Sequence, residues 1–205
     1  MVSSAVCIAT ITDDLFTEDF FKLIEQRYSS DSVEDFSDWR DTINKGSTLG
    51  DYERLHLANQ FANRRIRFVS DRDHWHKSDY WATPLESLGT KGGDCEDFAI
   101  FKYFTLKAMG VDENKMRLRY VRALLINEPH MVLIYFENPK AMPLVLDNLK
   151  TTILPADQRR DLKPVYSFNG QGLWLAKAQG LSTAKPTGGG TKNWTDLVNR
   201  IENGE

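Results

Sequence analysis

The spacing of apolar residues changes near the middle of this chain of 205 residues, from helical periods before Gly110 to alternation after Met116. Ahead of the change, apolar residues recur at helical spacing or form the largely apolar run Phe98 to Met109. Beyond it, they alternate as strand residues do. Helices followed by consecutive strands favour an α+β fold with helices packed on an antiparallel sheet, and the length favours one domain over residues 1–205.

The amino-terminal half divides into helical and irregular stretches. A helix is predicted from Thr17, whose hydroxyl can cap it, and a second helix from Asp51 to Arg64. The segment Ser29 to Ser37 between them is predicted to be a loop. Residues Asp71 to Gly93 are irregular and rich in aromatic residues and glycine, which suits a loop beside a functional site.

Three consecutive strands are predicted after the apolar run, at Met116 to Tyr120, His130 to Phe136 and Leu144 to Leu146. Near the carboxyl end, residues 185–192 include three consecutive glycines and are predicted to be a flexible link. A short closing helix, Trp194 to Glu202, is expected to dock back on the domain.

The composition argues against several classes of partner and site. A net charge of −3 provides no basic field, so neither nucleic acid nor an anionic membrane surface is expected as a partner. No stretch reaches the ~18 apolar residues of a membrane span, so no membrane insertion is expected. With only Cys7 and Cys95, a disulfide framework or cysteine-rich zinc site is not expected, although the count alone leaves a single Cys7–Cys95 bridge open.

Cys95 stands where a cysteine can act as a nucleophile. It follows Asp94 and opens an apolar run that ends before Gly110, a residue suited to the C′ position of a helix. The free N–H groups and the dipole of a helix amino terminus favour the thiolate, which is the reactive form of cysteine. A catalytic cysteine also needs a base within hydrogen-bond reach and a group that orients this base.

His130 and Asp147 meet these two needs if the second and third strands form a hairpin. Among the four histidines, only His130 begins a predicted strand. A hairpin in which Phe136 faces Ala141 places His130 opposite Asp147 in the same register, with their Cβ atoms about 4.5–5.5 Å apart. This register is chosen for its outcome, so a simpler interpretation stays open: a buried cysteine is commonly a small hydrophobe, and Asp147 can simply end a strand.

Longer motifs resemble a known family, the bacterial transglutaminase-like cysteine proteinases, and more narrowly the LapG-type adhesin-processing proteases of Gram-negative bacteria. The resemblance covers roughly Tyr80 to Leu175, and the segments that carry it are Trp81–Leu88, Gly92–Ile100, Pro129–Leu133, Leu144–Leu149 and Arg160–Asn169. It implies a papain-like or transglutaminase-like cysteine protease fold, with the nucleophile at a helix amino terminus. It also implies a catalytic triad of Cys95, His130 and Asp147.

Three carboxylates, Asp94, Glu96 and Asp97, crowd the thiol. As an ordinary feature, Asp94 caps the helix while the other two complement its dipole. Their charge would nevertheless raise the pKa of the thiol, and a bound cation would remove this conflict. Calcium suits oxygen ligands, and no set of histidines or cysteines nearby favours zinc. The resemblance likewise implies calcium dependence through the acidic residues beside the cysteine, here Asp94, Glu96 and Asp97.

The resemblance implies a calcium-dependent cysteine endopeptidase that cuts near the amino terminus of a large surface adhesin, at an Ala-Ala site, which releases the adhesin and disperses biofilm. It also implies a periplasmic location and inhibition by the periplasmic domain of an inner-membrane receptor for cyclic di-GMP. Residues Met1 to Asp13 lack a basic region and a long apolar run, so they are not an intact signal peptide, and we expect the leader to be absent from this sequence.

Two other functions remain open. A transglutaminase or amidase would use the same residues but pass the acyl group to an amine, and a non-catalytic binding module would keep the fold with an unreactive Cys95. For a protease, the Cys95 N–H is the natural first donor of an oxyanion hole, with Trp81 or Trp75 as a second. A narrow cleft walled by Trp75, Tyr80 and Trp81 would suit small residues at the cut site.

Overall fold

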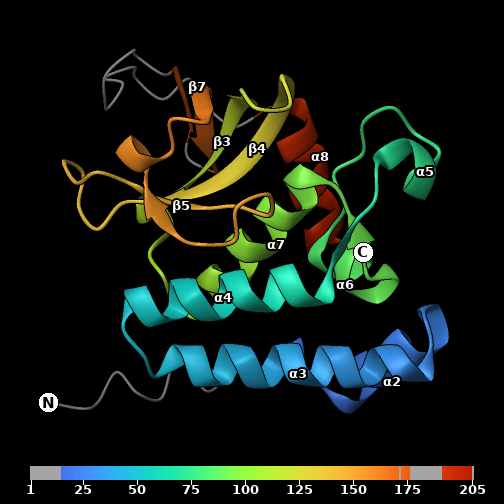
Figure 1. Cartoon of the computed structure of the whole chain (residues 1–205). Coiled ribbons are helices and arrows are strands. Elements are labelled where there is room, and N and C mark those ends of the chain that lie inside the picture. The colour runs from blue at the N-terminus through green and yellow to red at the C-terminus, as the bar shows by residue number, and fades with distance from the viewer. Residues whose placement is uncertain (1–14, 171, 176–190, 205) are drawn as a thin grey trace, which may run out of the picture.

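The computed structural model of this chain describes residues 15–170, 172–175 and 191–204. Figure 1 shows a twisted sheet covered on one face by a stack of helices, in which α7 (Cys95–Ala108) lies between the sheet and the helices α3 (Ser30–Ser47) and α4 (Asp51–Arg65). The fold therefore has the α+β class and the helix-on-sheet arrangement that the sequence predicts.

The two predicted amino-terminal helices are confirmed. Helix α2 (Glu18–Arg27) begins behind Thr17, whose hydroxyl accepts the N–H of Phe20 at 3.2 Å, and α4 starts at Asp51 and ends one residue beyond its predicted end. Both bury one face, because Ile24 of α2 and Leu55 of α4 lie in the main apolar core.

The loop predicted over Ser29 to Ser37 is wrong, because helix α3 occupies residues 30–47. Ser29 caps this helix by accepting the N–H of Ser32 at 3.3 Å, so the serines mark a helix start and not an irregular segment. Phe36, Trp39 and Ile43 follow at helical spacing and are buried in the core.

Helix α7 is the central element of the core. It contacts α4 on one side and the sheet on the other, and its residues from Asp97 to Leu106 are almost all buried. A helix that is apolar on most of its surface has to be buried in this way. It ends ahead of Gly110, which has a φ of 86°, as expected for a glycine after a helix.

The main sheet has six strands in the order β6-β5-β4-β3-β7-β8, and every neighbouring pair is antiparallel. The three predicted strands form β3, β4 and β5, whereas β6, β7 and β8 were not predicted. The strands, with the two short 3-10 turns η1 and η2, are β3 (Met116–Ala123), β4 (Glu128–Tyr135), β5 (Leu144–Leu146), β6 (Leu154–Pro155), β7 (Leu162–Asn169), β8 (Gly172–Leu175), η1 (Glu113–Lys115) and η2 (Ala156–Gln158).

The predicted register of the β4–β5 hairpin is wrong by two residues. Tyr135 pairs with Leu144 and Leu133 with Leu146, so the connection is longer than the four-residue turn on which the prediction relied. A shift of two residues leaves each side chain on the same face of a strand. Asp147, just beyond β5, therefore still reaches His130.

The stretch Asp71 to Gly93 is more regular than predicted. It contains the short helices α5 (Asp71–Trp75) and α6 (Pro84–Thr90), and Thr83 and Glu86 form a capping box at the start of α6. The two-residue strands β1 (Arg67–Phe68) and β2 (Gly92–Gly93) pair in parallel, one on each side of this stretch. Each strand leads directly into the helix that follows it, α5 or α7.

The closing helix is confirmed as α8 (Lys192–Glu202), where Trp194 stacks on Phe104 of α7 with ring centroids 5.9 Å apart. Residues 185–190 of the predicted link lie outside the described residues, and so does Cys7. Within the described part of the chain, no helix has the length and apolar character needed to cross a membrane.

Candidate active site

A cleft of about 770 Å³ lies where the amino terminus of α7 meets β4, and both Cys95 and His130 line it. Its wall is rich in acidic and aromatic side chains, and none of the described lysines or arginines lines it. The acidic group comprises Asp71, Asp79, Asp94, Glu96 and Glu128, and the aromatic group comprises Phe68, Trp81, Tyr120 and Tyr166.

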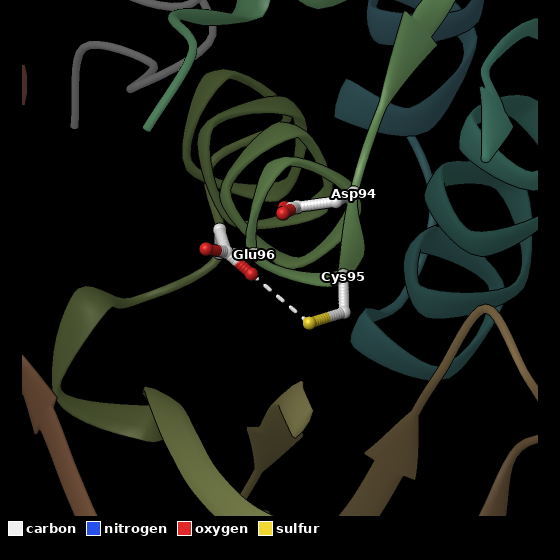
Figure 2. A group of neighbouring side chains, drawn as sticks. All are labelled: Asp94, Cys95 and Glu96. Carbon is white, nitrogen blue, oxygen red and sulfur yellow. Dashed lines mark hydrogen bonds between the residues drawn. The ribbon is translucent and has the colours of Figure 1, made fainter. Parts of the chain in front are cut away.

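Cys95 is the first residue of α7, and Asp94 is its N-cap residue. The thiol is free, partly buried, and donates a hydrogen bond to Glu96 Oε2 with the two atoms 3.0 Å apart, as Figure 2 shows. Burial raises the pKa of the thiol, and the neighbouring Glu96 charge raises it further. In this arrangement the acidic surroundings hold Cys95 as a thiol, against the effect of the helix dipole.

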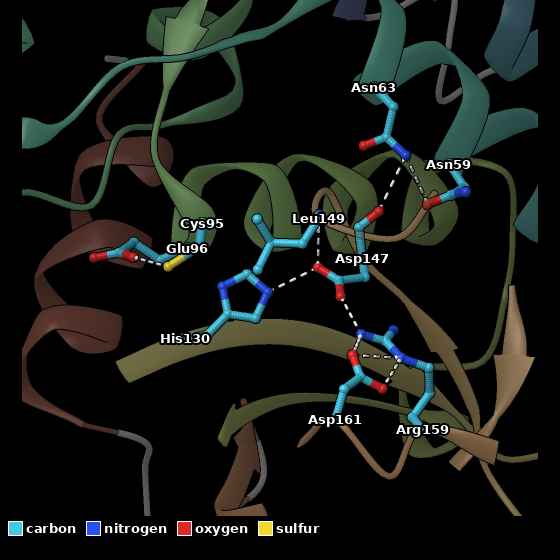
Figure 3. A network of polar contacts seen from close by, with 9 residues as sticks. All are labelled: Asn59, Asn63, Cys95, Glu96, His130, Asp147, Leu149, Arg159 and Asp161. Carbon is cyan, nitrogen blue, oxygen red and sulfur yellow. Dashed lines mark hydrogen bonds and ion pairs between the residues drawn. The ribbon is translucent and has the colours of Figure 1, made fainter. Parts of the chain in front are cut away.

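His130 and Asp147 are in direct contact. His130 Nε2 lies 2.7 Å from Asp147 Oδ1, and both side chains are buried. Figure 3 shows His130 between Cys95 and Asp147, with its second ring nitrogen, Nδ1, on the side that faces Cys95. Because Asp147 accepts at Nε2, the imidazole has Nδ1 available as a base toward the thiol.

The three predicted triad residues therefore gather at one site, but the thiol does not bond to the imidazole. Its hydrogen bond goes to Glu96 instead. A nucleophile and its base act together only within hydrogen-bond reach, and such contacts are often incomplete before a substrate binds. The arrangement thus places Glu96 in competition with His130 for Cys95.

Asp147 is held on both of its carboxylate oxygens. Oδ1 accepts the His130 Nε2–H and the N–H of Leu149 at 3.1 Å, while Oδ2 accepts Arg159 Nη2 at 2.6 Å. Burial acts to raise the pKa of Asp147, but the hydrogen bonds from His130 and Arg159 outweigh it and hold the pKa well below its usual range. Asp147 is therefore ionised, as a residue that orients and balances an imidazolium must be.

The parallel pairing of β1 with β2 brings a second acidic segment to the thiol. Asp71 follows β1 as Asp94 follows β2, so the amino ends of α5 and α7 lie side by side. Asp71, Asp94 and Asp97 each offer an oxygen within 4.8 Å of the others, and so do Asp71, Asp79 and Glu96. These five acidic residues are called the acidic cluster below.

The acidic cluster suits a hard cation. Asp71 Oδ1 and Asp94 Oδ1 are buried without a hydrogen-bond partner in the described structure. Burial and the nearby charge of Glu96 raise the pKa of Asp94 to about 10, and burial raises that of Asp71 to about 6. A nearby cation favours the ionised form of such carboxylates, and calcium binds carboxylate oxygens. The residues present therefore fit this ion.

Asp97 differs from the other members of the cluster. Its Oδ1 accepts the N–H of Ala82 at 2.8 Å, and its Oδ2 accepts the N–H of Asp94 at 3.1 Å. Both oxygens are thus engaged by backbone groups. Asp97 thereby links the segment before α6 to the start of α7 and fixes the position of Asp94.

The predicted aromatic wall is correct only for Trp81. Trp75 and Tyr80 do not line the cleft: their rings pack on each other with centroids 5.0 Å apart, and Tyr80 OH donates to Glu86 at 2.7 Å. The aromatic residues that replace them come from β1, β3 and β7, as Phe68, Tyr120 and Tyr166. Neither β1 nor β7 was predicted from the sequence, and β3 was predicted but was not expected to line the site.

Sequence reasoning missed Asp71, Asp79 and Arg159. The two aspartates lie in the stretch predicted as a loop, and only the β1–β2 pairing brings Asp71 to Asp94. Their acidity within an aromatic segment was the available signal. Arg159 stands beside Arg160, and composition does not distinguish the buried member of this pair from the exposed one.

This chain is similar to known proteins in both sequence and fold. The sequence profile of the bacterial transglutaminase-like cysteine proteinases matches residues 29–163. Legionella pneumophila LapG in its calcium-bound form is 38% identical, with a TM-score of 0.77 over 91% of this chain and 99% of that chain. The EGTA-treated form is 40% identical, with a TM-score of 0.77 over 90% of this chain and 96% of that one.

A third LapG structure from the same organism is 39% identical, with a TM-score of 0.76 over 90% of this chain and 96% of its own. A comparison with curated proteins gave no match. The profile covers more than half of the chain, and the structural likeness extends over nearly all of both chains. This chain belongs to the bacterial transglutaminase-like cysteine proteinases.

Proposed function

We propose that this protein is a calcium-dependent cysteine endopeptidase in which Cys95 is the nucleophile, His130 the base and Asp147 the group that orients the base. One observation carries the proposal. The His130–Asp147 pair, joined at 2.7 Å, opens into the same cleft as a cysteine at a helix amino terminus. These are the parts that acyl transfer through a thiol requires.

In the proposed reaction, His130 Nδ1 takes the proton of the Cys95 thiol as the sulfur attacks the peptide carbonyl carbon. The C–N bond then breaks, His130 returns the proton to the leaving amine, and a thioester remains on Cys95. Water attacks the thioester with His130 again as base, which releases the acid and restores the thiol. Asp147 stabilises the imidazolium, and the Cys95 N–H donates to the developing oxyanion.

Asp71, Asp94 and Glu96 are the residues that we propose as calcium ligands, with Asp79 and Asp97 beside them. Calcium bound there would supply positive charge next to the thiol. Glu96, which accepts the thiol hydrogen bond in this structure, would then hold the ion instead, and Cys95 would be free to bond to His130. The calcium-bound and EGTA-treated LapG structures support a role for calcium in this protein.

The resemblance also supports a substrate and a setting. We propose that the protein acts in the periplasm on the amino-terminal region of a large surface adhesin, at an Ala-Ala site, so that cleavage promotes biofilm dispersal. The periplasmic domain of an inner-membrane receptor for cyclic di-GMP is the proposed inhibitor. The acidic and aromatic cleft would hold an extended peptide with small side chains at the cut.

The test is incubation of the protein with adhesin amino-terminal fragments, with calcium or with EGTA, followed by mass determination of the products. Two new fragments that sum to the substrate plus one water are expected with calcium only. Cys95→Ala should give none while keeping the wild-type circular dichroism spectrum. A labelled amine in the same reaction separates the alternatives, because its incorporation would identify a transglutaminase and contradict the proposal.

A further inference from the structure

Arg159 lies behind Asp147, on the side away from Cys95 (Figure 3). It follows η2, and its side chain is only 1% exposed. Nη2 donates to Asp147 Oδ2 at 2.6 Å and to Asp161 Oδ2 at 2.8 Å, and Nε donates to Asp161 Oδ1 at 3.0 Å. A line of charged contacts thus leads from His130 through Asp147 and Arg159 to Asp161.

These contacts leave the Asp147 carboxylate little freedom to turn. His130 and the Leu149 N–H hold Oδ1, and Arg159 holds Oδ2, so rotation about the carboxylate would break bonds on both oxygens. Without Arg159, Oδ2 would lose the donor that it has in the described structure, which is costly for a buried ionised group. The carboxylate could then rotate or take up a proton.

Other polar groups near Asp147 do not make this contact. Lys102 of α7 approaches it from the helix side, but Lys102 Nζ has no hydrogen-bond partner in the described structure. Asn63 of α4 is neutral and bonds to the backbone carbonyl of Asp147 at 3.1 Å. Among the described residues, Arg159 is the charged side chain that donates to the Asp147 carboxylate.

We propose that Arg159 is a positioning residue of the triad, which fixes the Asp147 carboxylate in the orientation that accepts the His130 Nε2–H. Asp161 fixes Arg159 in turn, since it binds two of its nitrogens. This inference rests on the proposed function, because it assigns a role within the same site. Its consequence is that His130 keeps its proton on Nε2 and its lone pair on Nδ1, toward the thiol.

The first arm of the test is the pH dependence of kcat and KM for wild type, Arg159→Gln and Arg159→Lys. Arg160→Gln is the matched control, because it makes the same change at the adjacent exposed position. Arg159→Gln should lower kcat on the order of 10- to 100-fold with little change in KM. Its acid limb should move to higher pH as Asp147 becomes easier to protonate, and Arg159→Lys should restore part of the loss.

The second arm reads the imidazole directly and does not depend on cleavage. Nitrogen-15 NMR of the histidine rings, with His130 assigned from a His130→Gln sample, reports which nitrogen carries the proton. Wild type and Arg160→Gln should show the Nε2–H form, and Arg159→Gln a mixture of the two tautomers. If wild type cleaves no substrate, the proposed function fails while this arm still decides the role of Arg159.

A kcat and a His130 spectrum in Arg159→Gln equal to those of Arg160→Gln would overturn the inference. If circular dichroism shows that Arg159→Gln does not fold, Asp161→Asn decides instead. The Asp161 side chain is 26% exposed, and Arg159 keeps its ion pair with Asp147 in this variant. A mixed His130 tautomer and a reduced kcat in Asp161→Asn are expected, and wild-type values for both would overturn the proposal.

Discussion

At the scale of single residues, Asp71 and Asp94 meet although 22 residues of chain separate them, because each follows a strand of the β1–β2 pair. Each has one buried oxygen without a partner. Two such oxygens in the described structure are unfavourable in a site without a cation, since buried carboxylates are otherwise hydrogen-bonded or paired. Asp71 is thus central to the proposed calcium site.

Replacing Asp71 with asparagine should weaken calcium binding by roughly tenfold or more, because the site loses one negative ligand. Isothermal titration calorimetry measures the change. Asp73→Asn is the matched control, because Asp73 is exposed on the same helix. Its carboxylate accepts the Ser70 hydroxyl at 2.6 Å, and its N–H donates to Ser70 Oγ in the N-cap contact. Equal calcium affinity in the Asp71→Asn and Asp73→Asn proteins would remove Asp71 from the proposed site.

Some of the site can be read from the sequence, and some cannot. Cys95 is recognisable because its position at a helix start is a local property, encoded by Asp94 ahead of it and the apolar run behind it. Asp71 and Arg159 join the site only through long-range contacts, the first by strand pairing and the second by burial. No local pattern reports either of these.

Lys102 is a fully buried cation on α7. Burial lowers the pKa of Lys102 to about 7, while the charge of Asp147 acts in the opposite direction. Below that pKa the folded protein must bury a charged ammonium, whereas the unfolded chain leaves it in water. The cost is therefore largest below about pH 7 and fades as the pH rises toward the ordinary lysine pKa, about 10.4.

Lys102→Met should consequently raise the melting temperature by at least ~2 °C at pH 6, and the gain should shrink by pH 10. Thermal unfolding followed by circular dichroism at the two pH values measures this. Lys107→Met, at an exposed position of the same helix, should give no such gain. A gain for Lys102→Met that grows with pH would show that burial of Lys102 is not the cause.

At the scale of elements, α8 holds the segment before α6 in place through hydrogen bonds. Arg200 of α8 donates to Tyr80 OH at 2.6 Å, to Glu86 Oε2 at 2.9 Å and to the carbonyl oxygen of Trp81. Asn193 donates to Asp79 Oδ2 at 2.8 Å. The closing helix is therefore tied to a cleft wall and to a member of the acidic cluster.

Arg200→Ala should lower the free energy of unfolding by roughly 1–3 kcal/mol, because a partly buried charged donor is lost and its acceptors are left unpaired. Calcium affinity should fall as well, because Asp79 lies in the segment that loosens. Urea unfolding and calorimetry measure the two effects. Lys192→Ala removes an exposed cation of the same helix and is the control. Equal stability and equal calcium affinity in the two variants would show that α8 does not hold this segment in place.

Elements were predictable where their signals are local. The helices α2, α4 and α8 and the strands β3 to β5 follow from caps and from the period of their apolar residues. Helix α3 was missed because serines at its start suggest a loop, although Ser29 uses its side chain as a cap. The β4–β5 register was missed because it depends on the burial of Leu133 and Leu146 in the main core, which a turn length does not report.

At the scale of the whole molecule, the layers place the nucleophile and its base on different elements. Cys95 begins α7, His130 belongs to β4, and the core between helix and sheet fixes their separation. The acidic cluster lies at the same junction of helix and sheet, where Glu96 accepts the hydrogen bond of the thiol. On the proposed function, the reactivity of Cys95 depends on what those carboxylates bind.

This dependence can be measured through the reactivity of Cys95. The measurement is the rate of iodoacetamide labelling of Cys95 at neutral pH, followed by peptide mass determination, with excess calcium, with EGTA, and after calcium is restored. We predict fast labelling with calcium, slow labelling with EGTA and recovery on restoration, because calcium relieves the negative charge around the thiol. Equal rates in all three conditions would contradict the claim that the acidic cluster controls the nucleophile.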